Sequence, residues 1–242
     1  MDKKPPLLLI HGLRGNHLGL TTIARHLEKA GYEVYVPDLP PAGGQTLPEY
    51  TAESYAKFIG DYILKLKLDH PVLIGHSLGS IVATATASMF PELIGNEIIL
   101  LSPISNQPRR IFAALTPATA ILPNKPLGFI TTKYLYVPES EADLREILDI
   151  TYRCGSDYTT RRAVQKSAKF SAKHSIANFP LKDSFDITFI SGAEDHLIPR
   201  KETDALAHRL GAKTVYIKNS GHLINYEKPK EVADAILEAL AE

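Results

Sequence analysis

The stretch Val72-Leu73-Ile74-Gly75-His76-Ser77-Leu78-Gly79 decides the fold. Its first residues form a short apolar run that predicts a buried strand, and the small and apolar residues that follow predict a helix. A serine between the two lies on a strained turn that projects its hydroxyl out of the sheet edge, and Gly75 and Gly79 relieve the crowding there. The helix that begins at Leu78 adds the positive end of its dipole where an oxyanion would form. The pattern therefore predicts that Ser77 is a nucleophile.

Around this stretch, short apolar runs alternate with amphipathic segments. The runs show no strict alternation of apolar and polar residues, as expected for strands that are covered on both faces. We expect strands at residues 7–11, 33–37, 72–75, 97–101, 187–191 and 214–217, and helices at residues 17–30, 51–66, 78–90, 201–210 and 229–241. This order predicts an α/β fold with a mostly parallel sheet of about six strands, in which ligands bind beyond the carboxyl ends of the strands.

The alternation lapses between residues 104 and 182, where prolines break a series of helical segments. This part of the chain contains 12 Lys and Arg against 6 Asp and Glu, whereas the whole chain contains 27 of each. We expect a helical cap at residues 104–182, inserted into a core formed by residues 1–103 and 183–242. Its basic residues either steer an anionic substrate or form a solvated helix face, and both interpretations stay open.

The composition excludes several classes of function. The 242-residue chain has balanced charge, which gives no indication of nucleic acid as a partner. No apolar run approaches the ~20 residues of a membrane span, so we expect no stable membrane insertion and, by default, a cytoplasmic location. The single cysteine, Cys154, permits no disulfide within the chain. The histidines lack metal-ligand spacing and no Gly-rich phosphate loop is present, so we expect neither a metal nor a cofactor. The sequence does not indicate the oligomeric state.

Four further motifs accompany the serine motif. His11-Gly12-Leu13 ends the first expected strand, and Pro37-Asp38-Leu39-Pro40 ends the second. The other two are Gly192-Ala193-Glu194-Asp195-His196-Leu197-Ile198-Pro199 and Gly221-His222. With the serine motif they resemble the α/β-hydrolase family over essentially the whole chain, and the order serine, acid, histidine is the order of that family.

The resemblance implies a role for each residue of the site. Ser77 needs a base within hydrogen-bond reach, and His222 would accept its proton and later donate it to the leaving group. Asp195 would hold the imidazole in the correct tautomer and stabilise its cation. The backbone N–H groups of Leu13 and Leu78 would form the oxyanion hole.

Other residues compete for some of these roles. Glu194, Asp183 and Asp186 are alternative acids, although the spacing between Gly192 and Pro199 favours Asp195 and then Glu194. We expect three motif residues to be structural: a loop-stabilising His11, a turn-stabilising Asp38, and a His76 that packs beside the site without taking part in the chemistry.

The sequence departs from the family pattern at three places. Too few residues precede the first strand for the usual antiparallel hairpin, so we expect this hairpin to be reduced or absent. The loop at residues 41–46 differs from the usual family loop, which makes transfer of a substrate from any subfamily unsafe. Ser80 stands where many relatives carry glycine, which we expect to be a mild change.

The leading interpretation is a serine hydrolase that cleaves a small, lipophilic carboxylic ester through an acyl-enzyme. A second interpretation keeps the triad but assigns C–C bond hydrolysis or elimination on an anionic substrate, as in menaquinone-pathway or ring-fission members of the family. A third is a non-catalytic, ligand-binding protein with the same fold. The complete triad argues against the third, because loss of catalysis usually removes one triad member.

Overall fold

The six strands of the sheet are all parallel and lie in the order β2-β1-β3-β4-β5-β6 in a computed structural model that describes residues 4–104, 135–137 and 158–241. They are β1 (Leu7–Ile10), β2 (Val34–Tyr35), β3 (Val72–His76), β4 (Glu97–Leu101), β5 (Asp186–Gly192) and β6 (Lys213–Ile217). The predicted α/β fold is confirmed, and within the described residues the sheet has no antiparallel strand. Strand β2 is shorter than predicted because it pairs with β1 through only two residues and runs towards Pro37, which has no N–H to donate.

The helices of the described residues include the five that the periodicity predicts, one in the region expected to be a helical cap, and the short α10, which was not predicted. They are α1 (Thr21–Lys29), α2 (Ala52–Leu66), α3 (Leu78–Met89), α8 (Tyr158–Ser171), α9 (Arg200–Leu210), α10 (Ile224–Glu227) and α11 (Pro229–Ala239). The predicted helix at residues 17–30 is divided into a 3-10 turn, His17–Leu20, and α1. The Asn16 side chain accepts the Leu18 N–H at 2.9 Å, and Asp38 accepts the His17 N–H at 2.7 Å. These two side chains cap the 3-10 turn at its N-terminal end.

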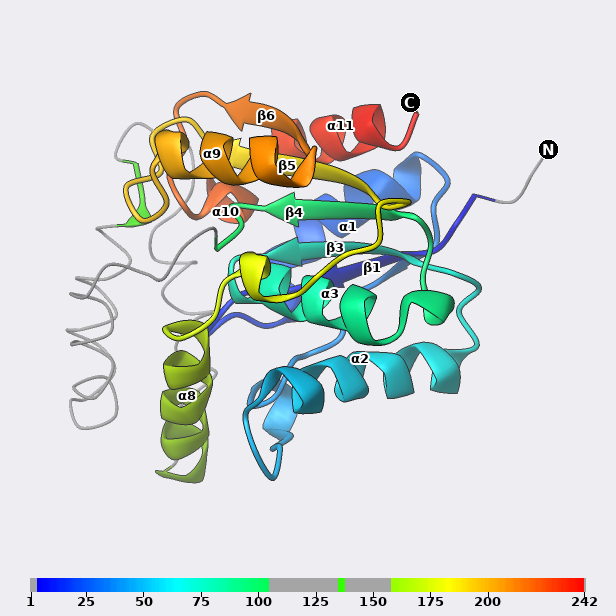
Figure 1. The fold of residues 1–242 in the computed structure, drawn as a ribbon, viewed down its shortest axis with the longest axis vertical. Coiled ribbons are helices and arrows are strands. Elements are labelled where there is room, and N and C mark those ends of the chain that lie inside the picture. Colours follow the sequence, from blue (N-terminus) through cyan, green and yellow to red (C-terminus); the bar gives the residue numbers. More distant parts are fainter. Residues whose placement is uncertain (1–3, 105–134, 138–157, 242) are drawn as a thin grey trace.

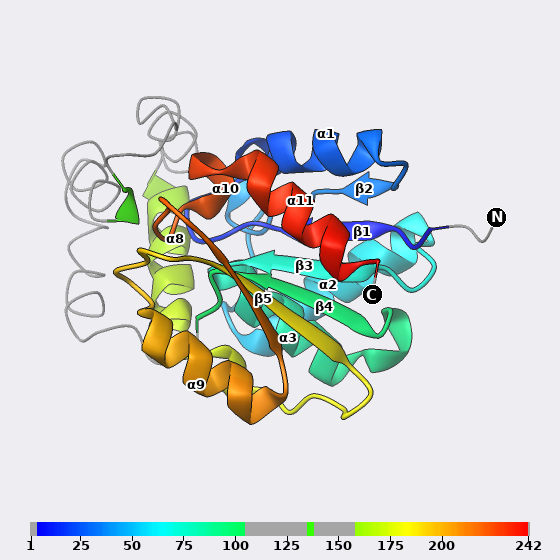
Figure 2. The same ribbon diagram turned by 90° about the horizontal axis from the view of Figure 1, so that it is seen from above.

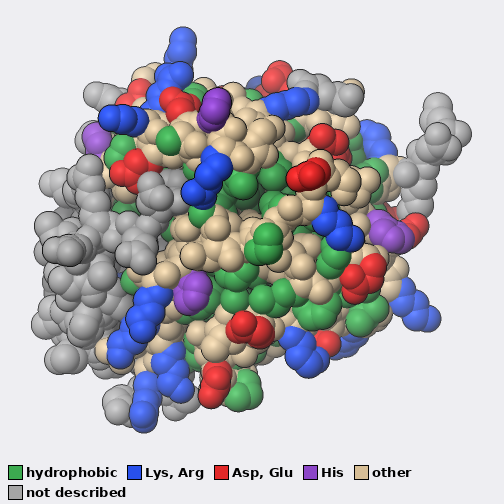
Figure 3. Space-filling view, in the orientation of Figure 1, with side chains coloured by type: hydrophobic (Ala, Val, Ile, Leu, Met, Phe, Trp, Pro, Cys, Tyr) green, Lys and Arg blue, Asp and Glu red, His purple; other side chains and the backbone are tan. Residues whose placement is uncertain are grey.

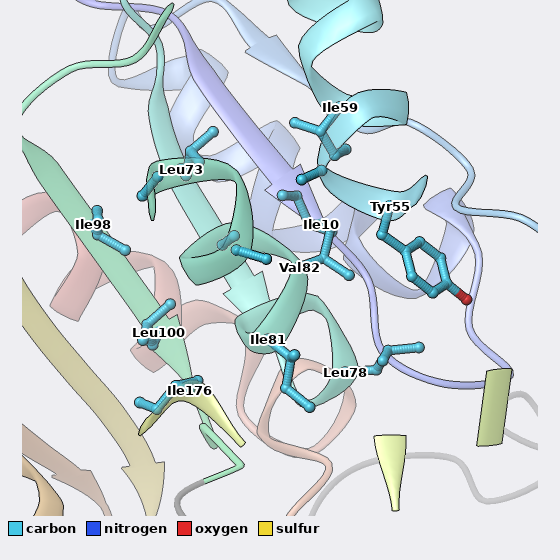
Figure 4. Close-up of a cluster of buried hydrophobic side chains, with 14 of the residues drawn as sticks. Ile10, Tyr55, Ile59, Leu73, Leu78, Ile81, Val82, Ile98, Leu100 and Ile176 are labelled. Atoms are coloured by element: carbon cyan, nitrogen blue, oxygen red, sulfur yellow. The ribbon is translucent and has the colours of Figure 1, made fainter. Parts of the chain in front are cut away.

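Alternate residues of each central strand face opposite sides of the sheet. Leu8 and Ile10 of β1 belong to a buried cluster with residues of α2, α3 and α9 (Figure 4). Leu7 and Leu9 belong to a second cluster with residues of α1 and α11. The sheet is therefore the middle layer of three, with helices on both faces (Figures 1 and 2).

The carboxyl ends of the strands point to the side of the molecule where α8 lies (Figures 1 and 2). Helix α8 belongs to the long connection between β4 and β5, the region predicted to be a cap. Most of that region lies outside the described residues, so the division into residues 1–103 and 183–242 as core and 104–182 as cap stays a prediction. The parallel arrangement brings the loops that follow β1, β3, β5 and β6 to one edge.

Candidate active site

Ser77 occupies the turn between β3 and α3 with an unusual backbone conformation. Its φ is 52° and its ψ is −115°, and its N–H donates to the Leu101 carbonyl of β4 at 3.0 Å. A Cβ at Gly75 would collide with the carbonyl of Gly79, and a Cβ at Gly79 would collide with the carbonyl of Ile10. The turn is therefore packed so tightly between β1, β3 and α3 that both positions require glycine.

His222 lies in the loop after β6 and contacts two of the other predicted residues. Its Nε2 lies 2.9 Å from Ser77 Oγ, and its Nδ1 lies 2.8 Å from Asp195 Oδ2. The His222 and Asp195 side chains are almost completely buried. Nδ1–H therefore donates to the carboxylate, and Nε2 is left to accept a proton from the serine hydroxyl.

Asp195, rather than one of its competitors, faces the imidazole. Its other oxygen accepts the backbone N–H groups of Leu197 at 2.8 Å and Ile198 at 2.9 Å, which fixes the carboxylate. Glu194 turns away and accepts the Ser220 N–H at 3.0 Å. The alternatives Asp183 and Asp186 lie before or at the first residue of β5, at the opposite edge of the sheet.

The loop after β1 lies directly against the serine turn. A Cβ at Gly12 would come within 3.1 Å of the Ser77 Cβ. Leu13 and Leu78, the two expected oxyanion donors, line one small pocket. The rest of its lining is formed by His11, Gly12, Arg14, Gly15, Leu39, Pro40, Pro41, Ala42, Val164 and Ser167. An apolar pocket therefore adjoins the nucleophile, with Arg14 as its charged residue.

Two buried histidines support the loops and are neutral. Burial lowers the pKa of His11, whose Nδ1–H donates to the Gly12 carbonyl at 2.9 Å while Nε2 accepts the Leu39 N–H at 2.8 Å. Burial, with a smaller contribution from the nearby His222, lowers the pKa of His76 to about 3. His76 Nε2–H donates to the His222 carbonyl at 3.0 Å. Asp38 also has a structural contact, since its carboxylate binds His17 Nδ1 at 2.9 Å.

Sequence reasoning missed Glu227, the last residue of α10. Its buried carboxylate accepts the N–H groups of Gly221 at 2.8 Å, Leu223 at 3.1 Å and Val137 at 3.4 Å. Burial raises its pKa to about 7, although the three hydrogen bonds act in the opposite direction. The available signal was an acidic residue that directly follows the largely apolar run after His222.

Two further side chains connect the site to its surroundings. The Ser80 hydroxyl donates to the Ser77 carbonyl at 2.5 Å and accepts the Ile104 N–H at 3.2 Å. The substitution that the sequence predicted to be mild therefore joins the serine turn to the start of the long connection after β4. The Tyr55 hydroxyl donates to the Pro40 carbonyl at 3.0 Å and lies 2.7 Å from Ser167 Oγ on α8.

Three basic residues of α8 lie on the outside of the molecule. Arg162, Lys166 and Lys169 are exposed, as is Lys173 just after the helix. Lysine and arginine side chains gather over α8 at the lower left of Figure 3. In the described part of the connection, the excess positive charge therefore forms a solvated face.

The described part of the chain has neither a candidate metal cluster nor a membrane-spanning helix. In residues 4–104, 135–137 and 158–241, no group of three or more His, Cys, Asp or Glu side chains could hold a metal ion. No helix within these ranges combines the length and the apolar character that crossing a bilayer requires.

Comparisons with known proteins agree with this architecture. A family model described as the alpha/beta hydrolase fold matches residues 5–229. Methylesterase 7 of Arabidopsis thaliana is 25% identical, over 98% of this chain and 98% of that protein. A probable alcohol acetyltransferase of Saccharomyces cerevisiae is 23% identical, over 97% of this chain and 77% of that protein. The structure of an esterase from Exiguobacterium antarcticum superposes with a TM-score of 0.84 at 16% identity, covering 100% of this chain and 94% of that one.

Proposed function

This chain belongs to the α/β-hydrolase family, and from that premise we propose that it is a serine hydrolase that cleaves a small, lipophilic carboxylic ester through an acyl-enzyme. The observation that carries the proposal is the pair of contacts through His222. Nε2 lies 2.9 Å from Ser77 Oγ, and Nδ1 lies 2.8 Å from Asp195 Oδ2. A nucleophile, a base and an acid that orients the base are thus aligned as acyl transfer requires.

The reaction proceeds in two half-reactions. Ser77 Oγ attacks the ester carbonyl while its proton passes to His222 Nε2, and the charge that develops on the carbonyl oxygen is stabilised by the N–H groups of Leu13 and Leu78. The tetrahedral intermediate collapses, the ester C–O bond breaks, and the departing alkoxide takes the proton from Nε2. Water then attacks the acyl-enzyme with His222 as base, and Ser77 leaves with the returned proton. Asp195 stays ionised throughout and stabilises the imidazolium.

The side chains beside the nucleophile favour a small, largely apolar substrate. Leu13, Leu39, Leu78 and Val164 line the space beside the nucleophile. The names of the methylesterase and of the Exiguobacterium esterase are consistent with ester chemistry. An anionic group on the substrate, as in the C–C hydrolase or lyase alternative, is a second candidate because Arg14 lines the same pocket.

The experiment is active-site labelling followed by turnover of a series of esters. We expect a fluorophosphonate probe to label the native protein and the control variant Ser88→Ala, which changes a serine on α3, but not Ser77→Ala. Turnover of p-nitrophenyl acetate and butyrate should fall by several orders of magnitude in Ser77→Ala. Absence of labelling in the native protein would exclude both the esterase and the lyase. Preference for p-nitrophenyl hemisuccinate over butyrate, lost in Arg14→Gln, would favour the anionic substrate.

A further inference from the structure

We propose that Glu227 is a positioning residue for His222, because its carboxylate binds the backbone N–H groups on both sides of that histidine. This inference rests on the proposed function, since it takes His222 to be the base. Among the described residues, the hydrogen bonds of Glu227 go to backbone N–H groups of the histidine loop and of segment 135–137, and Glu227 does not line the pocket beside Ser77. Its effect on the reaction passes through the loop alone.

Three consecutive N–H groups of the histidine loop are held by specific acceptors. Gly221 N–H donates to Glu227 Oε2 at 2.8 Å, and Leu223 N–H donates to Glu227 Oε1 at 3.1 Å. The N–H of His222 itself donates to the Leu135 carbonyl at 3.1 Å. With its two carboxylate oxygens, Glu227 therefore holds the N–H groups of the residues immediately before and after the base.

Glu227 also joins the histidine loop to the long connection between β4 and β5. Its Oε2 accepts the Val137 N–H at 3.4 Å, two residues after the Leu135 carbonyl that accepts from His222. The described segment 135–137 is thus hydrogen-bonded to both the base and the residue that positions it. A shift of this segment would be transmitted to the imidazole.

The chemistry of the side chain favours a positioning role over simple filling of the core. Glu227 is only 2% exposed, and burying its polar carboxyl group carries a cost that an apolar side chain would avoid. In return, its two oxygens offer directional acceptors to three backbone N–H groups at once. Catalysis by His222 requires that placement, since a displacement of about 1 Å at a reacting group can reduce a rate by about 100-fold.

The test compares Glu227→Gln with the native protein and with Glu231→Gln, the same chemical change at an exposed position on α11. An amide retains one accepting oxygen but replaces the other with an NH₂ group, so at least one loop N–H loses its acceptor. For p-nitrophenyl acetate we expect kcat to fall about 10- to 100-fold in Glu227→Gln, with KM changed less than about twofold. Glu231→Gln should behave as the native protein.

The second readout is the far-downfield NMR resonance of the His222 Nδ1–H, assigned by its absence in His222→Gln. It reports the contact with Asp195 without requiring turnover, so it separates this inference from the proposed function. We expect the resonance to shift or broaden in Glu227→Gln, whereas a side chain that only added stability would leave it unchanged in the folded protein. Should Glu227→Gln fail to fold, Glu227→Asp is measured instead. Aspartate keeps the carboxyl group, but its side chain is one methylene shorter, so the oxygens lie farther from the N–H groups of the loop. A folded variant with native kcat and an unaltered resonance would overturn the inference.

Discussion

Ser77 presents its hydroxyl from a backbone conformation that residues other than glycine rarely adopt. Its φ is 52° and its ψ is −115°, and the tightly packed neighbours of the turn hold the backbone in this conformation. Such a conformation costs on the order of 1–3 kcal/mol and persists only where the surroundings over-determine it. The N–H of Ser77 is bound by Leu101, and its carbonyl accepts from both the N–H and the hydroxyl of Ser80. Ser80 is thus part of what holds the nucleophile.

Replacing Ser80 by alanine tests that role at the level of a single hydroxyl. The variant loses the bond to the Ser77 carbonyl and leaves the buried Ile104 N–H without its acceptor. We expect the free energy of unfolding to fall by about 1–3 kcal/mol, because an unpaired buried donor carries its full desolvation penalty. Urea denaturation measures the loss. Ser88→Ala, near the end of the same helix, is the control and should change the free energy by less than about 0.5 kcal/mol. Equal losses of stability in the two variants would contradict the role of the Ser80 hydroxyl in holding the Ser77 turn.

At the scale of elements, Tyr55 connects three parts of the chain. It lies on α2, its ring is buried in the core, and its hydroxyl reaches the Pro40 carbonyl and Ser167 Oγ of α8 (Figure 4 shows the ring). Pro40 and Ser167 both line the pocket beside the nucleophile. The Tyr55 hydroxyl therefore connects Pro40, a pocket residue of the core, to Ser167, a pocket residue of the long connection, and fixes their separation.

Tyr55→Phe should loosen this arrangement while leaving the core packing intact. We expect a loss of about 1–2 kcal/mol in the free energy of unfolding, because the hydrogen bonds disappear while the ring is retained. KM for p-nitrophenyl butyrate should rise more than kcat falls, since the pocket walls move and the triad does not. A double-mutant cycle with Ser167→Ala measures the coupling, expected at about 0.5–1.5 kcal/mol. Tyr62→Phe, on the same helix, is the matched control; a coupling of zero would show that α8 is held by other contacts.

At the scale of the whole molecule, the sequence predicted a mostly parallel sheet that is covered on both faces. Apolar runs without alternation indicate strands covered on both faces, and the observed sheet is covered on both faces. Residues that end different parallel strands must converge at one edge, which is why Ser77, Asp195 and His222 could be expected to lie together.

The contacts that hold the site in place could not be predicted in the same way. The partners of Glu227 are backbone N–H groups. Because every residue except proline has such a group, no pattern of residue types identifies which ones Glu227 binds. Tyr55 lies on the helix expected at residues 51–66, and the apolar periodicity that predicts this helix depends on its ring and not on its hydroxyl. Ser80 was compared with the glycine of relatives on its own helix, although one of its partners, Ile104, lies beyond the next strand.

Two buried groups give the stability of the molecule opposite dependences on pH. Burial lowers the pKa of His76 from 6.5 to about 3, so the unfolded chain binds more protons between these values and acidification favours unfolding. Burial raises the pKa of Glu227 from 4.5 to about 7, so the folded chain binds more protons in that window and its contribution to stability is lost as the pH rises. The contribution of each group is isolated by comparing the native protein with a variant in which that group does not titrate.

His76→Gln provides this comparison for the acid side. The glutamine amide can still donate to the His222 carbonyl, as His76 Nε2–H does at 3.0 Å, but it does not take up a proton. Lowering the pH from about 6.5 to about 4.5 should therefore destabilise the native protein by about 2–3 kcal/mol more than the variant. Urea denaturation across this range gives the difference directly, with His208→Gln, at an exposed position on α9, as the control. If native protein and His76→Gln lose stability in parallel, His76 is protonated in the folded state and the buried, neutral donor to His222 is the wrong description.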